Sequence, residues 1–281
     1  MCRLDAVRHS RRWPDRGRAG GAVAELCHTT LKGNFRAIDT RAAEVILMEG
    51  TERVLSPYPK RLSGKARQSL ERLGVTVLMK AMVTDIDERG VSYGMGDEEL
   101  QLSARTKPWV VGVSASKFGL ALAKAPEATT DKGGRILVKA DLTVPGHSQM
   151  FAIGDLASVA GLSGEPLPGV APVAMQQGRS VARAIRARLA GRDVAPFRYV
   201  DKGNLAVIGR NAAVASFGRF GISGFPAWLT WIFVHIAHLI EFDNKMRVIF
   251  QWGWNYWTRK RGARLIMGDE LLPNHVVKDR S

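Results

Sequence analysis

The chain has 281 residues, and its mixture of hydrophobic and charged residues suits a globular protein of about two domains. A net charge of +15 indicates an anionic partner, namely nucleic acid, membrane lipid or a phosphorylated cofactor. Two cysteines, Cys2 and Cys27, are too few for a disulfide scaffold or a cysteine-based metal cluster, and they fit a reducing compartment. Because the Arg-rich start lacks the apolar region of a secretory signal, we expect the protein on the cytoplasmic side.

The N-terminal part predicts the strand, helix, strand order of a dinucleotide-binding sheet. Residues 1–18 hold six Arg and no apolar period, whereas helical periodicity begins near Gly20. A buried strand is expected at 43–49, an amphipathic helix at 63–73 and a second strand from Val75. This order favours a right-handed parallel crossover. Further strands are expected at 82–87, 91–94 and 108–113.

The run Phe151-Ala-Ile-Gly-Asp155 predicts an apolar strand that delivers one carboxylate to a ligand. Gly154 has no side chain to obstruct that ligand, and Asp155 can accept hydrogen bonds from the ribityl hydroxyls of a flavin. A helix expected at 171–189 would add free N–H groups and a positive dipole end around Val173 and Ala174, which suit the pyrimidine edge of a reduced flavin. A simple turn is the alternative.

Two positions in the first half are candidates for NADH binding. Glu49 ends the strand expected at 43–49, where an acidic residue accepts hydrogen bonds from the ribose of NADH and disfavours the 2′-phosphate of NADPH. A solvated carboxylate capping a helix is the alternative. Gly112 lies in the strand expected at 108–113, and its bare backbone could line the path of the nicotinamide. A tight turn explains Gly112 nearly as well.

Two positions after Asp155 are candidates for the redox centre. Gln176 lies one turn into the helix expected at 171–189, so its amide could hold a quinone carbonyl above the flavin ring. Lys202 precedes a strand expected at 205–209, and its cation could stabilise a reduced flavin or a quinone oxyanion. A solvated glutamine and a surface lysine are the alternatives.

The C-terminal third is aromatic and basic. An apolar stretch at 225–240 is shorter than the roughly 20 residues that a membrane span requires, and His235 and His238 interrupt it. With the tryptophans of 228–257 and the cations of 259–264, it indicates an amphipathic anchor that lies on an anionic membrane. A helical hairpin within a soluble core or a dimer interface is the alternative.

These motifs, in this order, resemble type II NADH dehydrogenase, the non-proton-pumping NADH:quinone oxidoreductase, a flavoprotein like the pyridine nucleotide-disulfide oxidoreductases. The resemblance runs from about Gly20 to Ile266. It is carried by Phe151-Ala-Ile-Gly-Asp155, Gly169-Val-Ala-Pro-Val-Ala-Met-Gln-Gln-Gly178, Asp201-Lys-Gly-Asn-Leu-Ala-Val-Ile-Gly-Arg210, Gly224-Phe-Pro-Ala-Trp228 and Arg261-Gly-Ala-Arg-Leu-Ile266.

The resemblance implies an α/β, Rossmann-like flavoprotein with two dinucleotide-binding domains, here partial, and a C-terminal amphipathic membrane anchor. Asp155 would bind FAD, Glu49 would bind the NADH ribose, and Gln176 and Lys202 would lie near the quinone. Hydride would pass from NADH to FAD and electrons then to a quinone, on the cytoplasmic face of the cell membrane, and a homodimer is compatible. The expected parts are 19–118 for an incomplete NADH domain, 119–197 for the returning part of the FAD domain and 198–281 for membrane association, through 225–264.

The chain departs from the family pattern in two ways. Pro172 replaces a glutamine that the family often carries, which removes one expected quinone contact. Neither the FAD-binding half nor the NADH glycine fingerprint is present upstream, so we expect a truncated form that binds FAD poorly, and whether the chain is active or inactive on its own stays open. Residues 8–18 can be back-translated with a choice of codons that, read one base later, encodes Val-Ile-Val-Gly-Gly-Gly-Pro-Thr-Gly-Val-Glu. We hypothesise that residues 1–18 are an out-of-frame translation of that fingerprint.

Other classes of function fit the sequence less well. A non-enzymatic basic protein bound peripherally to membranes, derived from such an enzyme, is the main alternative. No recognition helix or RNA-type aromatic motif supports nucleic-acid binding. The six histidines do not fall at metal-ligand intervals, and there is no local Ser/His/Asp or Cys/His set, so we expect neither a metal site nor a hydrolase.

Overall fold

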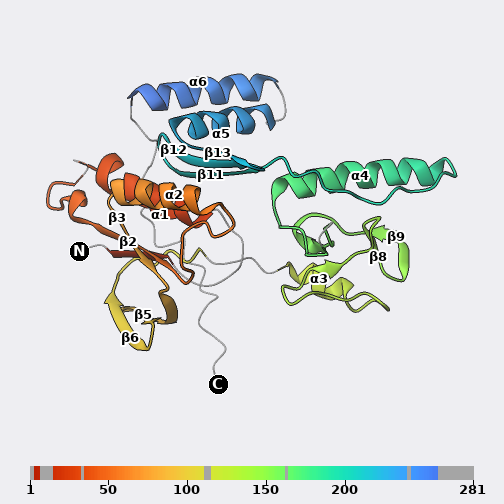
Figure 1. The fold of residues 1–281 in the computed structure, drawn as a ribbon, viewed down its shortest axis with the longest axis horizontal. Helices are drawn as coiled ribbons and strands as arrows, with labels where there is room; N and C mark the ends of the chain where they lie inside the picture. The colour runs from red at the N-terminus through yellow and green to blue at the C-terminus, as the bar shows by residue number, and fades with distance from the viewer. Residues whose placement is uncertain are drawn as a thin grey trace.

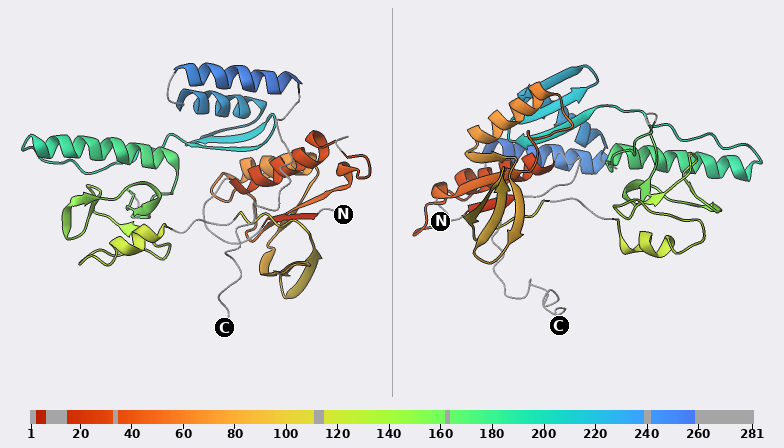
Figure 2. Two further views of the ribbon diagram at one scale, coloured as in Figure 1. Left: turned by 180° about the vertical axis from the view of Figure 1, so that it is seen from behind. Right: turned by 60° about the horizontal axis from the view of Figure 1, so that its bottom comes forward.

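The computed structural model describes residues 3–6, 15–32, 35–110, 115–161, 164–238 and 242–258. Its described elements form two lobes (Figures 1 and 2). One lobe joins the N-terminal sheet and helices to the last strands and helices of the chain, and the other carries α3, β7 to β10 and α4. Elements far apart in the sequence therefore share the first lobe.

A three-stranded parallel sheet begins the first lobe. It has the order β1 (Arg3–Ala6), β2 (Glu44–Glu49) and β3 (Val75–Met79), joined by α1 (Asp15–Glu25) and α2 (Lys60–Arg72). The crossover expected from the strand at 43–49 and the strand from Val75 is confirmed by the parallel pairing of β2 with β3. Strand β1 and the start of α1 lie within the Arg-rich 1–18, and α1 begins five residues before Gly20.

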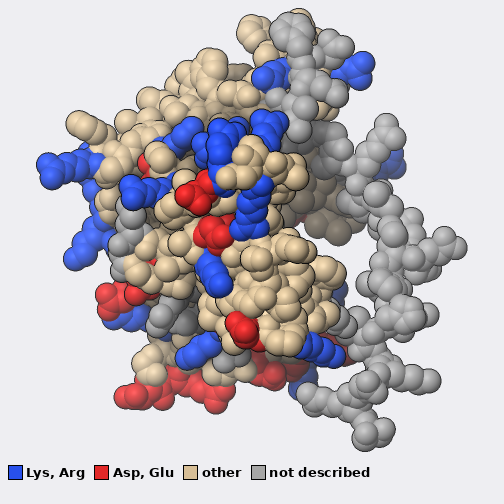
Figure 3. Space-filling view, turned by 90° about the vertical axis from the view of Figure 1, so that its right-hand side faces the viewer, with Lys and Arg blue, Asp and Glu red and all other residues tan. Residues whose placement is uncertain are grey.

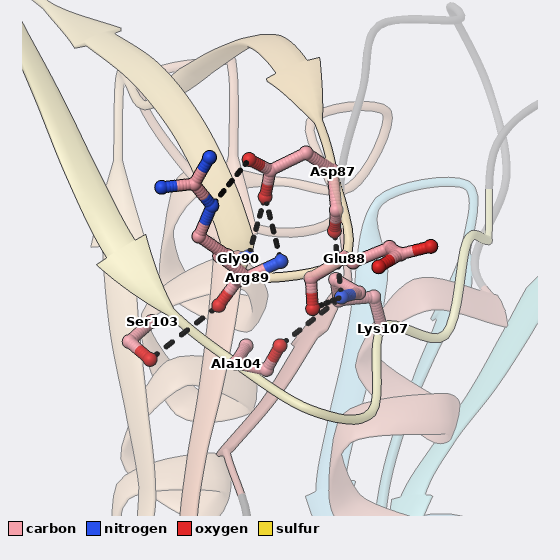
Figure 4. Close-up of polar contacts among 7 residues, drawn as sticks. All are labelled: Asp87, Glu88, Arg89, Gly90, Ser103, Ala104 and Lys107. Atoms are coloured by element: carbon pink, nitrogen blue, oxygen red, sulfur yellow. Dashed lines mark hydrogen bonds and ion pairs between the residues drawn. The ribbon is translucent and has the colours of Figure 1, made fainter.

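An antiparallel sheet of β4 (Met82–Ile86), β5 (Gly90–Met95) and β6 (Glu98–Ser103) follows. Figure 4 shows its first turn, where the Asp87 carboxylate accepts the backbone N–H groups of Arg89 and Gly90, and Lys107 donates to three backbone carbonyls. The bond from Gly90 is the main cause that lowers the pKa of Asp87. The prediction of a strand at 108–113 is wrong for residues 108–110, which are irregular chain after β6. Residues 111–114 lie outside the described residues.

The C-terminal sheet packs between two helical layers. It consists of β11 (Asn204–Gly209), β12 (Ala212–Phe217) and β13 (Phe220–Gly224), of which β13 had no sequence signal. Helices α1 and α2 cover one face, and α5 (Phe225–His238) covers the other beneath α6 (Phe242–Thr258) (Figure 1). Alternation decides this arrangement, because Ala206, Ile208 and Val214 enter the core of the first lobe while Ala213 and Ala215 pack with Ala227 of α5.

The second lobe has a small core. It contains α3 (Lys117–Leu122), the parallel pair β7 (Ile136–Leu137) and β10 (Ala157–Ser158), and the antiparallel pair β8 (Thr143–Val144) and β9 (His147–Phe151). A short 3₁₀ helix, η3 (Gly154–Leu156), leads towards the long α4 (Ala171–Leu189). The main core cluster joins Ala128, Ile136, Val144, Ala152 and Ala157.

The helix expected at 171–189 agrees with α4, and the apolar stretch at 225–240 forms α5 within the described part. In the described ranges, none of the helices combines the length and the apolar character needed to cross a membrane. The cations at 259–264, expected to flank the anchor, lie outside the described residues.

Candidate functional site

Asp155 lies in a turn, which corrects the expectation of a strand ending in Gly-Asp. Strand β9 ends at Phe151, Ile153 remains extended, and Gly154 begins the 3₁₀ helix η3. Gly154 has a φ of +67°, a backbone conformation that residues with a side chain rarely adopt. The chain therefore bends sharply before Asp155, whose side chain is exposed to solvent.

The start of α4 packs directly against this turn. The side chain of Gln177, 1% exposed, accepts a hydrogen bond of 2.7 Å from the backbone N–H of Gly154. Val173 is buried on the same face of α4, and the Cβ of Ala174 lies 3.6 Å from the position that a Cβ on Gly154 would take. These contacts fix Asp155 relative to the first turn of α4.

Gly169 provides the close approach on the other side of Asp155. A Cβ on Gly169 would lie 3.0 Å from Oδ1 of Asp155, so a side chain there would crowd the carboxylate. Two residues later α4 begins. The backbone N–H groups of Val173 and Ala174 donate to the backbone oxygen of Val170, at 3.0 and 3.2 Å, so the expectation of free N–H groups at these two residues is wrong. The exposed carboxylate of Asp155 thus lies beside the N-terminus of α4, a helix of 19 residues. The positive end of a helix dipole favours electron-rich groups.

Gln176 and Lys202 are brought to the same region by one contact. The side-chain amide of Gln176 donates to the backbone oxygen of Val200 and accepts from its N–H, both at 3.0 Å. This pair joins α4 to the segment before β11, in which Lys202 is exposed two residues later. The amide of Gln176 is therefore hydrogen-bonded to the backbone of Val200, and it holds the segment that carries Lys202 against α4.

Glu49 ends β2, as expected from the sequence, in the first lobe. Its side chain is 7% exposed, and Oε1 accepts hydrogen bonds from the backbone N–H and the hydroxyl of Thr51, at 3.1 and 3.0 Å. The carboxylate is thereby oriented at the carboxyl end of a parallel strand, the edge where open α/β sheets bind ligands. Gly112 lies outside the described residues.

The residues around Asp155 fit a flavin in chemical type. They combine an exposed carboxylate acceptor, a helix start and two glycines, Gly154 and Gly169, at which an added side chain would disturb the turn. Sequence reasoning gave no structural role to Gln177 or Gly169, although both lie in the motif 169–178. Their roles depend on the fold, because Gln177 contacts a residue 23 positions away.

Comparisons with known proteins identify the family of the chain. Residues 25–178 match the family model described as pyridine nucleotide-disulphide oxidoreductase. The chain is similar to the type II NADH:quinone oxidoreductase Ndh of Mycobacterium tuberculosis, with 40% identity over 256 residues, 90% of this chain and 54% of that protein. It is also similar to NdhA of the same organism, with 36% identity over 92% of this chain and 55% of that protein.

Solved structures agree on the fold. The NDH2 of Plasmodium falciparum, in complex with NADH, has a TM-score of 0.83 at 15% identity, covering 94% of this chain and 67% of that chain. This chain spans about half the length of the curated relatives it matches. The expected cofactors, FAD and NADH, are supported by the family and by these relatives. The resemblance found in the sequence is thus confirmed, and the chain belongs to the pyridine nucleotide-disulphide oxidoreductase family, with type II NADH:quinone oxidoreductases among its relatives.

Proposed function

We propose that the chain is part of an FAD-dependent NADH:quinone oxidoreductase. The observation that carries this proposal is the junction of the Gly154 turn with the start of α4, which places the Asp155 carboxylate beside a helix terminus. When bound, FAD would supply the chemistry by accepting a hydride from NADH and passing electrons to a quinone. The described residues supply binding and orientation.

Each candidate residue has a defined task in this proposal. Asp155 accepts hydrogen bonds from flavin hydroxyls, and the positive end of the α4 dipole, around Val173 and Ala174, favours the electron-rich edge of the flavin. Glu49 accepts hydrogen bonds from the NADH ribose and repels the 2′-phosphate of NADPH. Lys202 stabilises negative charge on the quinone side, and Gln176 holds its segment in place.

Membrane attachment through α5 and α6 belongs to the same proposal. Large side chains of this hairpin are exposed, including Phe233 at 65%, Phe250 at 70% and Trp257 at 88%. Aromatic side chains with neighbouring cations favour an interface with anionic lipid. We infer a peripheral location on the cytoplasmic face, where quinone enters from the membrane, and a homodimer is compatible with this placement.

The test is NADH oxidation coupled to reduction of a soluble quinone by the purified chain with excess FAD. Because the chain is expected to bind FAD poorly, we expect weak activity that appears only with excess added FAD and that prefers NADH to NADPH. Asp155→Asn should weaken FAD binding, whereas Glu49→Gln should reduce the preference for NADH without changing FAD binding.

Two results would contradict the proposal. One is the absence of NADH oxidation at saturating FAD while the Mycobacterium tuberculosis relative is active in the same assay. The other is an equal effect of Asp155→Asn and of Asp193→Asn, an exposed carboxylate after α4 that serves as the control, on FAD binding. Vesicle binding without NADH oxidation would favour the non-enzymatic membrane protein.

A further inference from the structure

Two arginines, one on α1 and one in the turn between β11 and β12, contact the α5–α6 hairpin. The guanidinium of Arg18, on α1, lies 5.5 Å from the centre of the Trp231 ring on α5. The guanidinium of Arg210, in the turn between β11 and β12, lies 4.3 Å from the centre of the Tyr256 ring on α6. Cations within about 6 Å of an aromatic ring face are attracted to it. Arg18 therefore contacts α5, and Arg210 contacts α6.

Arg210 also forms hydrogen bonds to α1 and to α6. Its backbone N–H donates to the carboxylate of Glu25 on α1, and its guanidinium donates to the backbone oxygen of Tyr256 on α6. Glu25 is 8% exposed. The turn is tight, because a Cβ on Gly209 would lie 2.9 Å from Oε1 of Glu25 and 2.7 Å from Leu73. Glu25 thus fixes the backbone of residue 210, and the Arg210 side chain reaches α6.

The contacted rings belong to the aromatic contacts between α5 and α6, in which Tyr256 is 41% exposed. Tyr256 lies 5.5 Å from Trp228 between ring centres, and Trp231 stacks on Trp252 at 5.6 Å with planes 1° apart. Trp254 and Trp257, on the same helix as Tyr256, are 69% and 88% exposed. A rotation of α6 would exchange these two sets of side chains, because they lie on different faces of one helix.

We propose that Arg210 is a positioning residue, which fixes the orientation of α6 against α1 and thereby selects the aromatic side chains that meet the lipid. The guanidinium is directed at Tyr256 in the protein, so its charge acts on α6 rather than on a lipid phosphate. The lipid step rests on the proposed membrane attachment, whereas the orientation of α6 does not.

The first test is amide hydrogen exchange of the full chain carrying Arg210→Gln. Because the bond from residue 210 to Glu25 uses the backbone N–H, this variant keeps the link to α1 and loses only the link to α6. We expect amide exchange in 242–258 to become about tenfold faster, while exchange in α2 stays unchanged. Arg219→Gln, in the exposed turn between β12 and β13, removes the same charge and should leave both regions unchanged.

Conservative variants separate positioning from general stability. Tyr256→Phe keeps the ring and the backbone oxygen, so it should exchange like the unmodified chain. Tyr256→Leu removes the ring but keeps the backbone oxygen that accepts from Arg210, so its exchange in 242–258 should lie between that of the unmodified chain and that of Arg210→Gln. If exchange in 242–258 is the same for Arg210→Gln and Arg219→Gln, Arg210 does not position α6.

The second test is binding to vesicles of phosphatidylcholine and phosphatidylglycerol. Arg210→Gln should bind roughly fivefold more weakly than Arg219→Gln, although both have the same net charge. Equal binding of the two variants would overturn the selection of lipid-facing side chains. If the unmodified chain does not bind vesicles, the proposed membrane attachment fails, and the exchange experiment alone decides the role of Arg210.

Discussion

At the scale of single residues, one buried amide decides the geometry of the candidate site. Gln177 satisfies the backbone N–H of Gly154, which would otherwise lack this partner at a bend with a φ of +67°. Its neighbour Gln176 makes its bonds to Val200 in an exposed position. Two adjacent residues of the same type thus act differently, because water can replace the partners of only one.

Replacing Gln177 by leucine should lower the free energy of unfolding by about 1–3 kcal/mol, because it leaves a buried donor unsatisfied. The matched change Gln176→Leu should cost about 1 kcal/mol or less, since water reaches that position. Thermal unfolding followed by circular dichroism would compare the two. Equal losses would show that the Gly154 turn does not depend on Gln177.

At the scale of elements, close backbone contact joins α1 to β11. A Cβ on Gly21 would lie 1.8 Å from the backbone oxygen of Ile208, so the helix and the strand approach without an intervening side chain. Gly20 also faces side chains of the core, Leu47 and Leu70. Glycine is common in turns, but Gly20 and Gly21 lie inside a helix, where the lack of a side chain allows close packing.

Gly21→Ala should destabilise the first lobe by about 3 kcal/mol or more, because backbone must move to accept the methyl group. Gly64→Ala, an exposed glycine inside α2 with no heavy atom within 4 Å of the added Cβ, should instead stabilise by about 0.5–1 kcal/mol. Urea unfolding of both variants measures the contrast. A tolerated Gly21→Ala would mean that α1 does not pack on β11 in this way.

At the scale of the whole molecule, charge and aromatic surface are distributed unevenly. Figure 3 shows Lys and Arg side chains gathered on the face at the side of α4, with Asp and Glu concentrated at one end of the view. The exposed aromatic side chains of α5 and α6 lie in the other lobe. The net charge of +15 therefore does not by itself locate the membrane-facing surface.

The hairpin should also respond to pH through His235. Partial loss of hydration beside the ring of Trp231, whose centre lies 4.1 Å from that of the imidazole, lowers the pKa of His235 below its ordinary value of 6.5, and the charges of Arg18 and His238 act in the same direction. The backbone oxygen of Trp231 opposes them by accepting from Nδ1. The folded state thus favours neutral His235, and its contribution to stability is present above about pH 6.5 and is lost as the pH falls.

Acidification from about pH 7.5 to pH 5.5 should therefore speed amide exchange in α5 relative to α2. The variant His235→Gln should lose that pH dependence, whereas His147→Gln, in the second lobe, should retain it. Exchange must be corrected for its intrinsic dependence on pH. Faster exchange in α5 at the higher pH would contradict the assigned direction.

Local patterns were sufficient to predict elements with strong periodicity. Helix α4 matches the expected residues 171–189, and β2, β3, β11 and β12 lie where alternating or buried runs predicted strands. Short or polar strands escaped prediction, as β6 and β13 show, because pairing with a neighbour rather than composition makes them strands.

The sequence by itself determined the family and the parallel crossover, and it proposed the candidate ligand residues, because all three depend on residue types at short separations. Only the tertiary structure decided that Gln177 supports Gly154, that Gln176 holds the segment of Lys202, and that Glu25 and Arg210 join α1 to α6. Residues 25 and 210 are 185 positions apart, and no periodicity reports a contact at such a separation. Such contacts form only when several packed elements bring both side chains to one place.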